Sequence, residues 1–315
     1  MNGMVDAAVQ NEQTAHVELV EVGARDGLQN ESVVLDTRTK VDLIERLVGA
    51  GTRRIEVASF VHPGRVPQMA DAEAVVGALG PSPDGVSYIG LVLNRIGLER
   101  ALATTVDEVN FVVGASDGFN RANTGVAPET TMAEIETMIG IAEGRRTTVT
   151  VSVAFGCPYD GPVPGEDVVR LAARAAEAGA DEIALGDTIG VAVPSQVTAL
   201  VEAIRSVTAA PLRGHFHDTR NTAVANAAAA YGAGVTTLDS SVGGAGGCPF
   251  APNATGNVAT EDLLYLFERM GIETGIDHTK ILETADWLGA QLGRSLSSAI
   301  GRAGWWPRSS RSVDQ

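Results

Sequence analysis

The sequence is poor in cysteine, lysine and aromatic residues. Its 315 residues include two cysteines, two lysines and 4% aromatic side chains. Two cysteines, Cys157 and Cys248, cannot build a framework of several disulfides, and each precedes a proline in a glycine-rich stretch. This cysteine pattern does not indicate a protein from an oxidising compartment, so we expect a soluble cytoplasmic protein.

Positive charge and long apolar runs are also scarce. The formal net charge is −16, whereas surfaces for nucleic acid or anionic membranes need clustered lysine and arginine. No apolar run approaches the roughly 18 residues that cross a bilayer. Residues 1–16 lack the positive start and the apolar segment of a signal peptide. We therefore expect neither nucleic acid nor a membrane as a partner.

Short runs rich in valine and isoleucine recur along the chain and predict eight strands. They lie at 17–23, 54–60, 87–93, 108–114, 148–155, 182–188, 213–219 and 236–244. Stretches with helical periodicity separate them, as at 39–48 and 166–178, and glycines such as Gly51, Gly179 and Gly232 often end these stretches. Strands that alternate with helices predict an α/β fold, the (β/α)8 TIM barrel. An open doubly wound sheet is the alternative, but GARDG after the first strand is no glycine-rich phosphate turn.

The organisation that follows is a single catalytic domain. We expect a flexible N-terminus at 1–16, one barrel domain over 17–300 and a disordered tail at 301–315. Helical patterns at 260–270 and 279–292 predict additional C-terminal helices that complete and cover the barrel.

Polar residues gather where the predicted strands end, which is where TIM barrels carry their chemistry. The candidates near these ends are Arg25, Asp26, Glu56, Ser59, Asn123, Cys157, Asp187, Thr188, His215, His217 and Cys248. Residues two apart on a strand share a face, so His215 and His217 both point into the barrel. With Asp26 and the amide of Asn257 they would form a mixed nitrogen and oxygen site that suits Mg²⁺ or Mn²⁺.

The sequence resembles the hydroxymethylglutaryl-CoA lyase family. The resemblance rests on VGARDGLQNE, IEVASFV, VPQM, GCPYDG, LGDTIGV, GHFHDT and GGAGGCPFAPNATGNVATEDL, in this order, and covers roughly residues 17–298. It implies a metal-dependent carbon–carbon lyase that cleaves an acyl-CoA on a TIM barrel, as a homodimer or larger homo-oligomer. Leucine breakdown, ketone-body formation and another carboxylic acid route are the alternative pathways for such an activity, and the sequence does not choose between them.

The resemblance assigns a role to several residues. It places the metal ligands at Asp26, His215, His217 and Asn257, the catalytic arginine at Arg25, its supporting carboxylate at Glu56 and the loop cysteine at Cys248. Either His215 or Asp26 would be the general base, and the thiol of Cys248 would pass a proton to the enolate carbon. Candidate substrate contacts are Gln29, Ser59, Asn123, Cys157, Asp187 and Thr188, although the pair Asp187 and Thr188 could equally cap the following helix.

Departures from the family pattern concern the substrate. Ser32 and the segment His62–Arg65 stand where relatives carry lysines, and the cysteine loop reads PFAPNATGN. The expected reaction is cleavage of 3-hydroxy-3-methylglutaryl-CoA to acetoacetate and acetyl-CoA. A related substrate such as citramalyl-CoA, which gives pyruvate and acetyl-CoA, is the alternative. A Claisen-condensing synthase should lack the cysteine loop, and a non-catalytic binding barrel should lack one of the key side chains.

Overall fold

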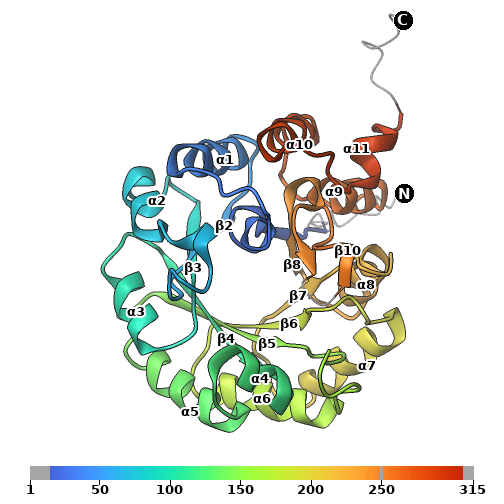
Figure 1. Cartoon of the computed structure of the whole chain (residues 1–315). Helices are drawn as coiled ribbons and strands as arrows, with labels where there is room; N and C mark the ends of the chain where they lie inside the picture. The colour runs from blue at the N-terminus through green and yellow to red at the C-terminus, as the bar shows by residue number, and fades with distance from the viewer. Residues whose placement is uncertain (1–14, 249–250, 308–315) are drawn as a thin grey trace, which may run out of the picture.

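The computed structural model describes residues 15–248 and 251–307, with the backbone alone for residues 248 and 251–255. Eight parallel strands form a closed barrel with helices around it (Figure 1). The strands are β1 (Glu18–Glu21), β2 (Arg54–Ser59), β3 (Ser87–Val92), β4 (Glu108–Gly114), β5 (Arg146–Ser152), β6 (Glu182–Asp187), β7 (Leu212–Phe216) and β8 (Thr237–Ser240). Each strand pairs with its neighbours in sequence, and β1 pairs with β8 to close the barrel. The predicted (β/α)8 barrel is therefore confirmed.

The outer ring consists of helices that follow the strands. They are α1 (Thr37–Gly49), α2 (Ala72–Leu79), α3 (Arg95–Leu102), α4 (Asp117–Thr124), α5 (Pro128–Ile139), α6 (Gly165–Glu177), α7 (Pro194–Arg205), α8 (Ala223–Gly232), α9 (Thr260–Arg269), α10 (His278–Leu292) and α11 (Ala299–Ala303). The buried side chains of α6 are Val168, Leu171, Ala172 and Ala175, which recur at helical spacing and face the barrel. No helix in the described part of the chain is long and apolar enough to cross a membrane.

The C-terminal helices complete the ring between α8 and α1. Helix α10 lies beside α1, where the backbone N–H of Asp277 donates to the carbonyl oxygen of Ala50 over 2.8 Å (Figure 1). Of the predicted N-terminal segment, residues 1–14 lie outside the described residues, while Ala15 and Val17 form backbone hydrogen bonds with Glu273. Helix α11 crosses the boundary predicted at residue 301, and residues 308–315 lie outside the described residues.

Glycines end the helices where the sequence predicted. Gly232 is the last residue of α8, and Gly234, two residues later, adopts the left-handed conformation with φ +91°. Gly51 and Gly179 do adopt positive φ after α1 and α6, as the pattern predicted.

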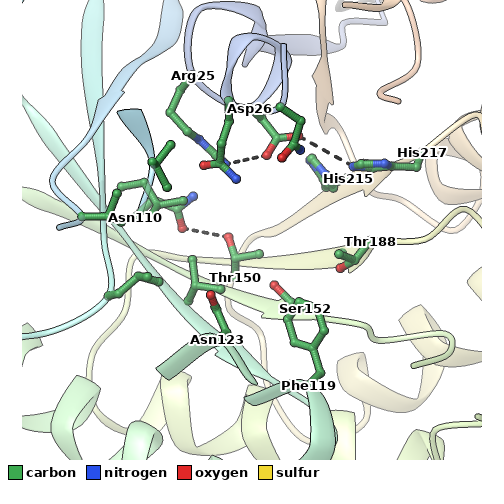
Figure 2. A pocket seen from close by; sticks show the side chains of 18 of the residues that line it. Arg25, Asp26, Asn110, Phe119, Asn123, Thr150, Ser152, Thr188, His215 and His217 are labelled. Carbon is green, nitrogen blue, oxygen red and sulfur yellow. Dashed lines mark hydrogen bonds and ion pairs between the residues drawn. The ribbon is translucent and has the colours of Figure 1, made fainter. Parts of the chain in front are cut away.

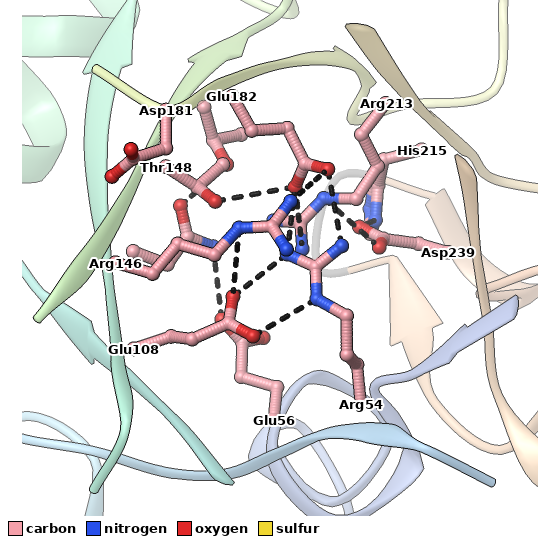
Figure 3. A network of polar contacts seen from close by, with 12 residues as sticks. Arg54, Glu56, Glu108, Arg146, Thr148, Asp181, Glu182, Arg213, His215 and Asp239 are labelled. Atoms are coloured by element: carbon pink, nitrogen blue, oxygen red, sulfur yellow. Dashed lines mark hydrogen bonds and ion pairs between the residues drawn. The ribbon is translucent and has the colours of Figure 1, made fainter. Parts of the chain in front are cut away.

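The floor of the barrel interior carries charge. Arg54, Glu108 and Glu182 are the first residues of β2, β4 and β6, and all three are buried. The guanidinium of Arg54 lies 2.7 Å from the Glu108 carboxylate and 2.9 Å from that of Glu182 (Figure 3). Side chains from alternate strands share a layer in such barrels, so these three residues form one ion-paired layer below the mouth.

Candidate active site

Arg25 and Asp26 lie in a single π-helical turn, Gly23–Gly27, directly after β1. The turn is pressed so closely against its surroundings that two glycines are needed. A Cβ on Gly23 would lie 2.6 Å from Oε1 of Glu21, and one on Gly27 would lie 2.7 Å from Oγ of Ser241. Such irregular turns are frequent at functional sites, and this one directs both charged side chains into the barrel mouth.

Two carboxylates hold Arg25. Its Nε donates to Oε2 of Glu56 over 2.6 Å, and Nη1 donates to Oδ1 of Asp26 over 2.5 Å. Oε1 of Glu56 accepts from Asn110, whose amide oxygen accepts from Thr150 over 2.7 Å. The Glu56 carboxylate is 1% exposed, so its charge requires these partners. The guanidinium is thereby fixed in one orientation at the pocket wall.

His215, His217 and Asp26 form a compact cluster on the same side of the mouth. One potential ligand atom from each lies within 4.8 Å of the others, and the two imidazole centroids are 5.1 Å apart. Nε2 of His217 is 3.7 Å from Oδ2 of Asp26. The amide of Asn257 donates to that same carboxylate oxygen over 2.8 Å. The four predicted ligands therefore meet at one point.

The cluster fits a divalent cation. It offers two imidazoles and a carboxylate, with an amide beside them, which is a donor set for Mg²⁺ or Mn²⁺. Nε2 of His217, 3.7 Å from Oδ2 of Asp26, is the ring nitrogen that faces the cluster, whereas its buried Nδ1 has no hydrogen-bond partner within the described chain. Asp26, His215, His217 and Asn257 are the residues that would hold the ion.

Charge in the cluster is balanced by close partners. Burial acts to raise the pKa of Asp26, but Arg25 and the imidazoles of His217 and His215 outweigh it and hold that pKa well below its usual range. Burial acts to lower the pKa of His215, but the Asp239 carboxylate, 2.9 Å from Nδ1, raises it above its usual value. Asp26 is thus ionised near neutral pH.

The cluster opens into a pocket of about 380 Å³ at the mouth of the barrel. Figure 2 shows Arg25, Asp26 and the histidines on one side, with Asn123 and Phe119 on the other. Val61, Leu91 and Val112 form an apolar wall, and Val66 and Leu93 pack against it. Thr150, Ser152 and Thr188 supply hydroxyl groups to the lining, and Arg65 adds a guanidinium whose Nη1 donates to the carbonyl oxygen of Asn123 over 3.2 Å.

The predicted substrate contacts separate into two groups. Gln29, Asn123 and Thr188 line the pocket. Ser59, Cys157 and Asp187 are buried and lie outside the lining. The Asp187 carboxylate accepts hydrogen bonds from the backbone N–H groups of Val191 and Ala192 in the loop before α7, and it does not cap that helix, whose N-cap is Val193. Sγ of Cys157 accepts from the backbone N–H groups of Tyr159 and Asp160, each over 3.3 Å.

Cys248 lies in a short hairpin at the edge of the mouth. Its strand β9 (Gly247–Cys248) pairs with β10 (Ala251–Thr255), and the thiol itself lies outside what the structure describes. The hairpin returns to the histidine cluster, because Asn257 forms a bridge with His217 and Gly256 accepts from the backbone N–H of Asp218 over 2.7 Å. The cysteine loop therefore starts and ends beside the predicted metal ligands.

Three residues of the site were not identified from sequence. Asn110 and Thr150 support Glu56, and Asp239 supports His215. A lone amide in the apolar run EVNFVVG was the available signal for Asn110. Asp239 gave a comparable signal inside TTLDSSVGG, but its partner on the neighbouring strand depends on register.

A family comparison agrees with this geometry. The HMGL-like family model matches residues 16–288 of the chain. The protein belongs to the HMGL-like family. It is 44% identical to the (R)-citramalyl-CoA lyase of Chloroflexus aurantiacus over 300 residues, covering 91% of this chain and 95% of that protein. It is also 44% identical to the hydroxymethylglutaryl-CoA lyase of Pseudomonas mevalonii over 290 residues, covering 91% and 96%.

Solved structures of HMGL-like enzymes superpose closely on this chain. The HMG-CoA lyase of Bacillus subtilis has a TM-score of 0.89 at 40% identity and covers 92% of this chain and 98% of its own. An HMG-CoA lyase from Acinetobacter baumannii, solved with coenzyme A and 3-methylmalate, has a TM-score of 0.90 at 35% identity and covers 95% and 99%. This HMGL-like chain is therefore a carbon–carbon lyase of the acyl-CoA type.

Proposed function

We propose that this lyase cleaves 3-hydroxy-3-methylglutaryl-CoA to acetoacetate and acetyl-CoA. One observation carries the proposal: the Asp26, His215 and His217 cluster and the fixed guanidinium of Arg25 face the same pocket. Retro-Claisen cleavage needs both features, because the hydroxyl at C3 loses its proton while charge develops on the thioester oxygen.

Each side chain has a task in this reaction. A bound divalent cation supplies Lewis acidity to substrate oxygens when it is present. Arg25 offsets the charge that grows on the thioester oxygen, and Glu56 keeps its guanidinium in place. Asp26 and His215 are the candidate bases for the C3 hydroxyl, and the low pKa of Asp26 makes it the weaker base. Cys248 delivers a proton to the enolate carbon of the leaving acetyl-CoA.

The apolar wall supports a substrate that is methylated at C3. Val61, Leu91 and Val112 are largely buried and present branched side chains to the pocket. A methyl group placed there would leave water, which contributes roughly 0.8 kcal/mol for each carbon buried. The guanidinium of Arg65 lies at the Asn123 side and suits the free carboxylate of the acyl chain.

A second candidate substrate is citramalyl-CoA. The relative from Chloroflexus aurantiacus is named for that substrate and matches the present chain over most of its length. Citramalyl-CoA has the same hydroxyl and methyl groups on C3, but its carboxylate is one methylene nearer to that carbon. The apolar wall and the cation-binding cluster would serve both substrates.

The test is acetyl-CoA release by the purified protein with Mg²⁺, measured in parallel on both thioesters and repeated after chelation. We expect metal-dependent turnover, with the higher kcat/KM on 3-hydroxy-3-methylglutaryl-CoA. A higher kcat/KM on citramalyl-CoA would select the second candidate. Absence of turnover on either thioester, with metal bound, would overturn both assignments.

A further inference from the structure

His215 has a buried carboxylate partner, Asp239, at Nδ1 of its ring, and both residues belong to the pocket wall. Its Nδ1 lies 2.9 Å from Oδ2 of Asp239, and both residues are less than 10% exposed. An ionised carboxylate can only accept a hydrogen bond, so the proton of the neutral imidazole resides on Nδ1. The lone pair of His215 is then on Nε2.

Asp239 also faces the charged interior of the barrel, through an ion pair that lacks hydrogen-bond geometry. Its Oδ1 forms an ion pair with Nε of Arg213 at 3.3 Å, and Arg213 is 1% exposed. Arg213 also faces Glu182, which pairs with Arg54 in the ion-paired floor (Figure 3). The two oxygens of Asp239 therefore have different partners, a cation on one side and the imidazole N–H on the other.

We propose that Asp239 is a positioning residue that holds the Nδ1–H tautomer of His215, with Arg213 holding Asp239 in turn. The Nε2 lone pair is thereby kept for the pocket, where it binds a metal ion or accepts a proton. Carboxylate partners of this kind fix ring orientation and tautomer at metal-binding histidines, and their loss lowers metal affinity or activity by about 10- to 100-fold. Only the catalytic readout of this inference rests on the proposed function.

The substitution Asp239→Asn discriminates between positioning and simple packing. The amide has the shape of the carboxylate but only one acceptor oxygen, and Arg213 offers only donors. The oxygen would turn to Arg213, and the NH₂ group would face Nδ1 of His215. The imidazole would then carry its proton on Nε2, and no lone pair would be presented to Asp26 and His217.

The first measurement is ¹⁵N NMR of the histidine rings in the metal-free full-length protein. We expect the wild type to show His215 protonated on Nδ1 and Asp239→Asn to show it protonated on Nε2. The second is Mn²⁺ titration, in which the variant should bind about 10- to 100-fold more weakly. Acetyl-CoA release should fall at least as far.

Asp262→Asn is the matched control, since Asp262 accepts hydrogen bonds from the backbone of α11 and lies outside the pocket lining. It should keep the His215 tautomer, the Mn²⁺ affinity and the turnover. If Asp239→Asn lowers only the melting temperature, with tautomer and affinity unchanged, Asp239 is a packing residue and the proposal fails. Nε2 protonation in the wild type would also overturn it, without any variant. A protein that shows both shifts but cleaves neither thioester would refute the proposed function alone.

Discussion

Arg25 and Glu56 form a buried hydrogen-bonded ion pair, with Nε of the guanidinium 2.6 Å from Oε2 of the carboxylate. Arg25 follows β1 and Glu56 lies within β2, and the pair fixes the orientation of the only guanidinium that contacts Asp26 among the described residues. Glu56 has no exposed face and one further partner, the amide of Asn110. The main role of Glu56 is therefore to hold the Arg25 guanidinium in place.

The substitution Glu56→Gln should lower kcat by about 100-fold, because Arg25 loses the charge that orients it. KM should change little, since Glu56 does not line the pocket. Steady-state acetyl-CoA release measures both constants. The control is Glu73→Gln. It removes an exposed carboxylate that accepts two hydrogen bonds from Arg100, and it should leave both constants unchanged. An effect confined to KM would contradict the orienting role.

Removal of the metal should abolish turnover, and added Mg²⁺ or Mn²⁺ should restore it, because cleavage depends on Lewis acidity at the cluster. His217→Ala deletes one of the two imidazoles and should weaken Mn²⁺ binding by about 100-fold or more in a titration monitored by electron paramagnetic resonance. His62→Ala is the control, since His62 is exposed and outside the cluster. Full activity after exhaustive chelation would refute the metal dependence.

The two cysteines should respond differently to replacement by alanine. Cys248→Ala should lower turnover strongly while the variant still binds acyl-CoA, because the proton donor to the enolate carbon is lost. Cys157→Ala is the matched control. Sγ of Cys157 accepts hydrogen bonds from two backbone N–H groups and lies away from the pocket lining. Loss of this thiol should therefore lower the melting temperature and leave kcat unchanged. Equal kcat for Cys248→Ala and wild type would remove the proton-transfer role.

Stability should depend on pH through Glu21. Burial raises the pKa of Glu21 to about 7 from 4.5, although hydrogen bonds from Thr260, Val242 and Gly23 act to lower it. Because the unfolded chain ionises first, the stability from this group is complete below about pH 4.5 and is lost as pH rises to about 7. Glu21→Gln should therefore gain stability relative to wild type over that interval, by at most about 3 kcal/mol. Urea unfolding at pH 5 and pH 8 measures it, and a difference independent of pH would contradict the assignment.

Much of the fold was predictable, because each strand is a short apolar run between helical patterns and parallel barrels repeat that unit. The convergence of Asp26, His215 and His217 was predictable as well, because strand ends meet at one mouth and residues two apart share a face. Asn257 follows the cysteine hairpin, and its place in the cluster came from the family resemblance and the donor set.

Other parts of the site depend on information that a single sequence does not display. The pairing of Asp239 with His215 requires the register between neighbouring strands. Asp187 shows the reverse case, because its position at a strand end suggested substrate contact while nearby backbone N–H groups occupy its carboxylate. Local turn geometry, which side-chain patterns do not encode, decides how such a residue is used.

The hairpin that carries Cys248 is joined at its base to the strand end that carries the histidines. Asp218 donates to Gly256, Val258 donates to Phe216, and His217 and Asn257 are bridge partners. Opening that base would break hydrogen bonds on both segments at once. In hydrogen–deuterium exchange, the amides of Asp218 and Val258 should therefore behave as one cooperative unit, so that solvent reaches the histidine cluster and the root of the cysteine loop in a single opening event.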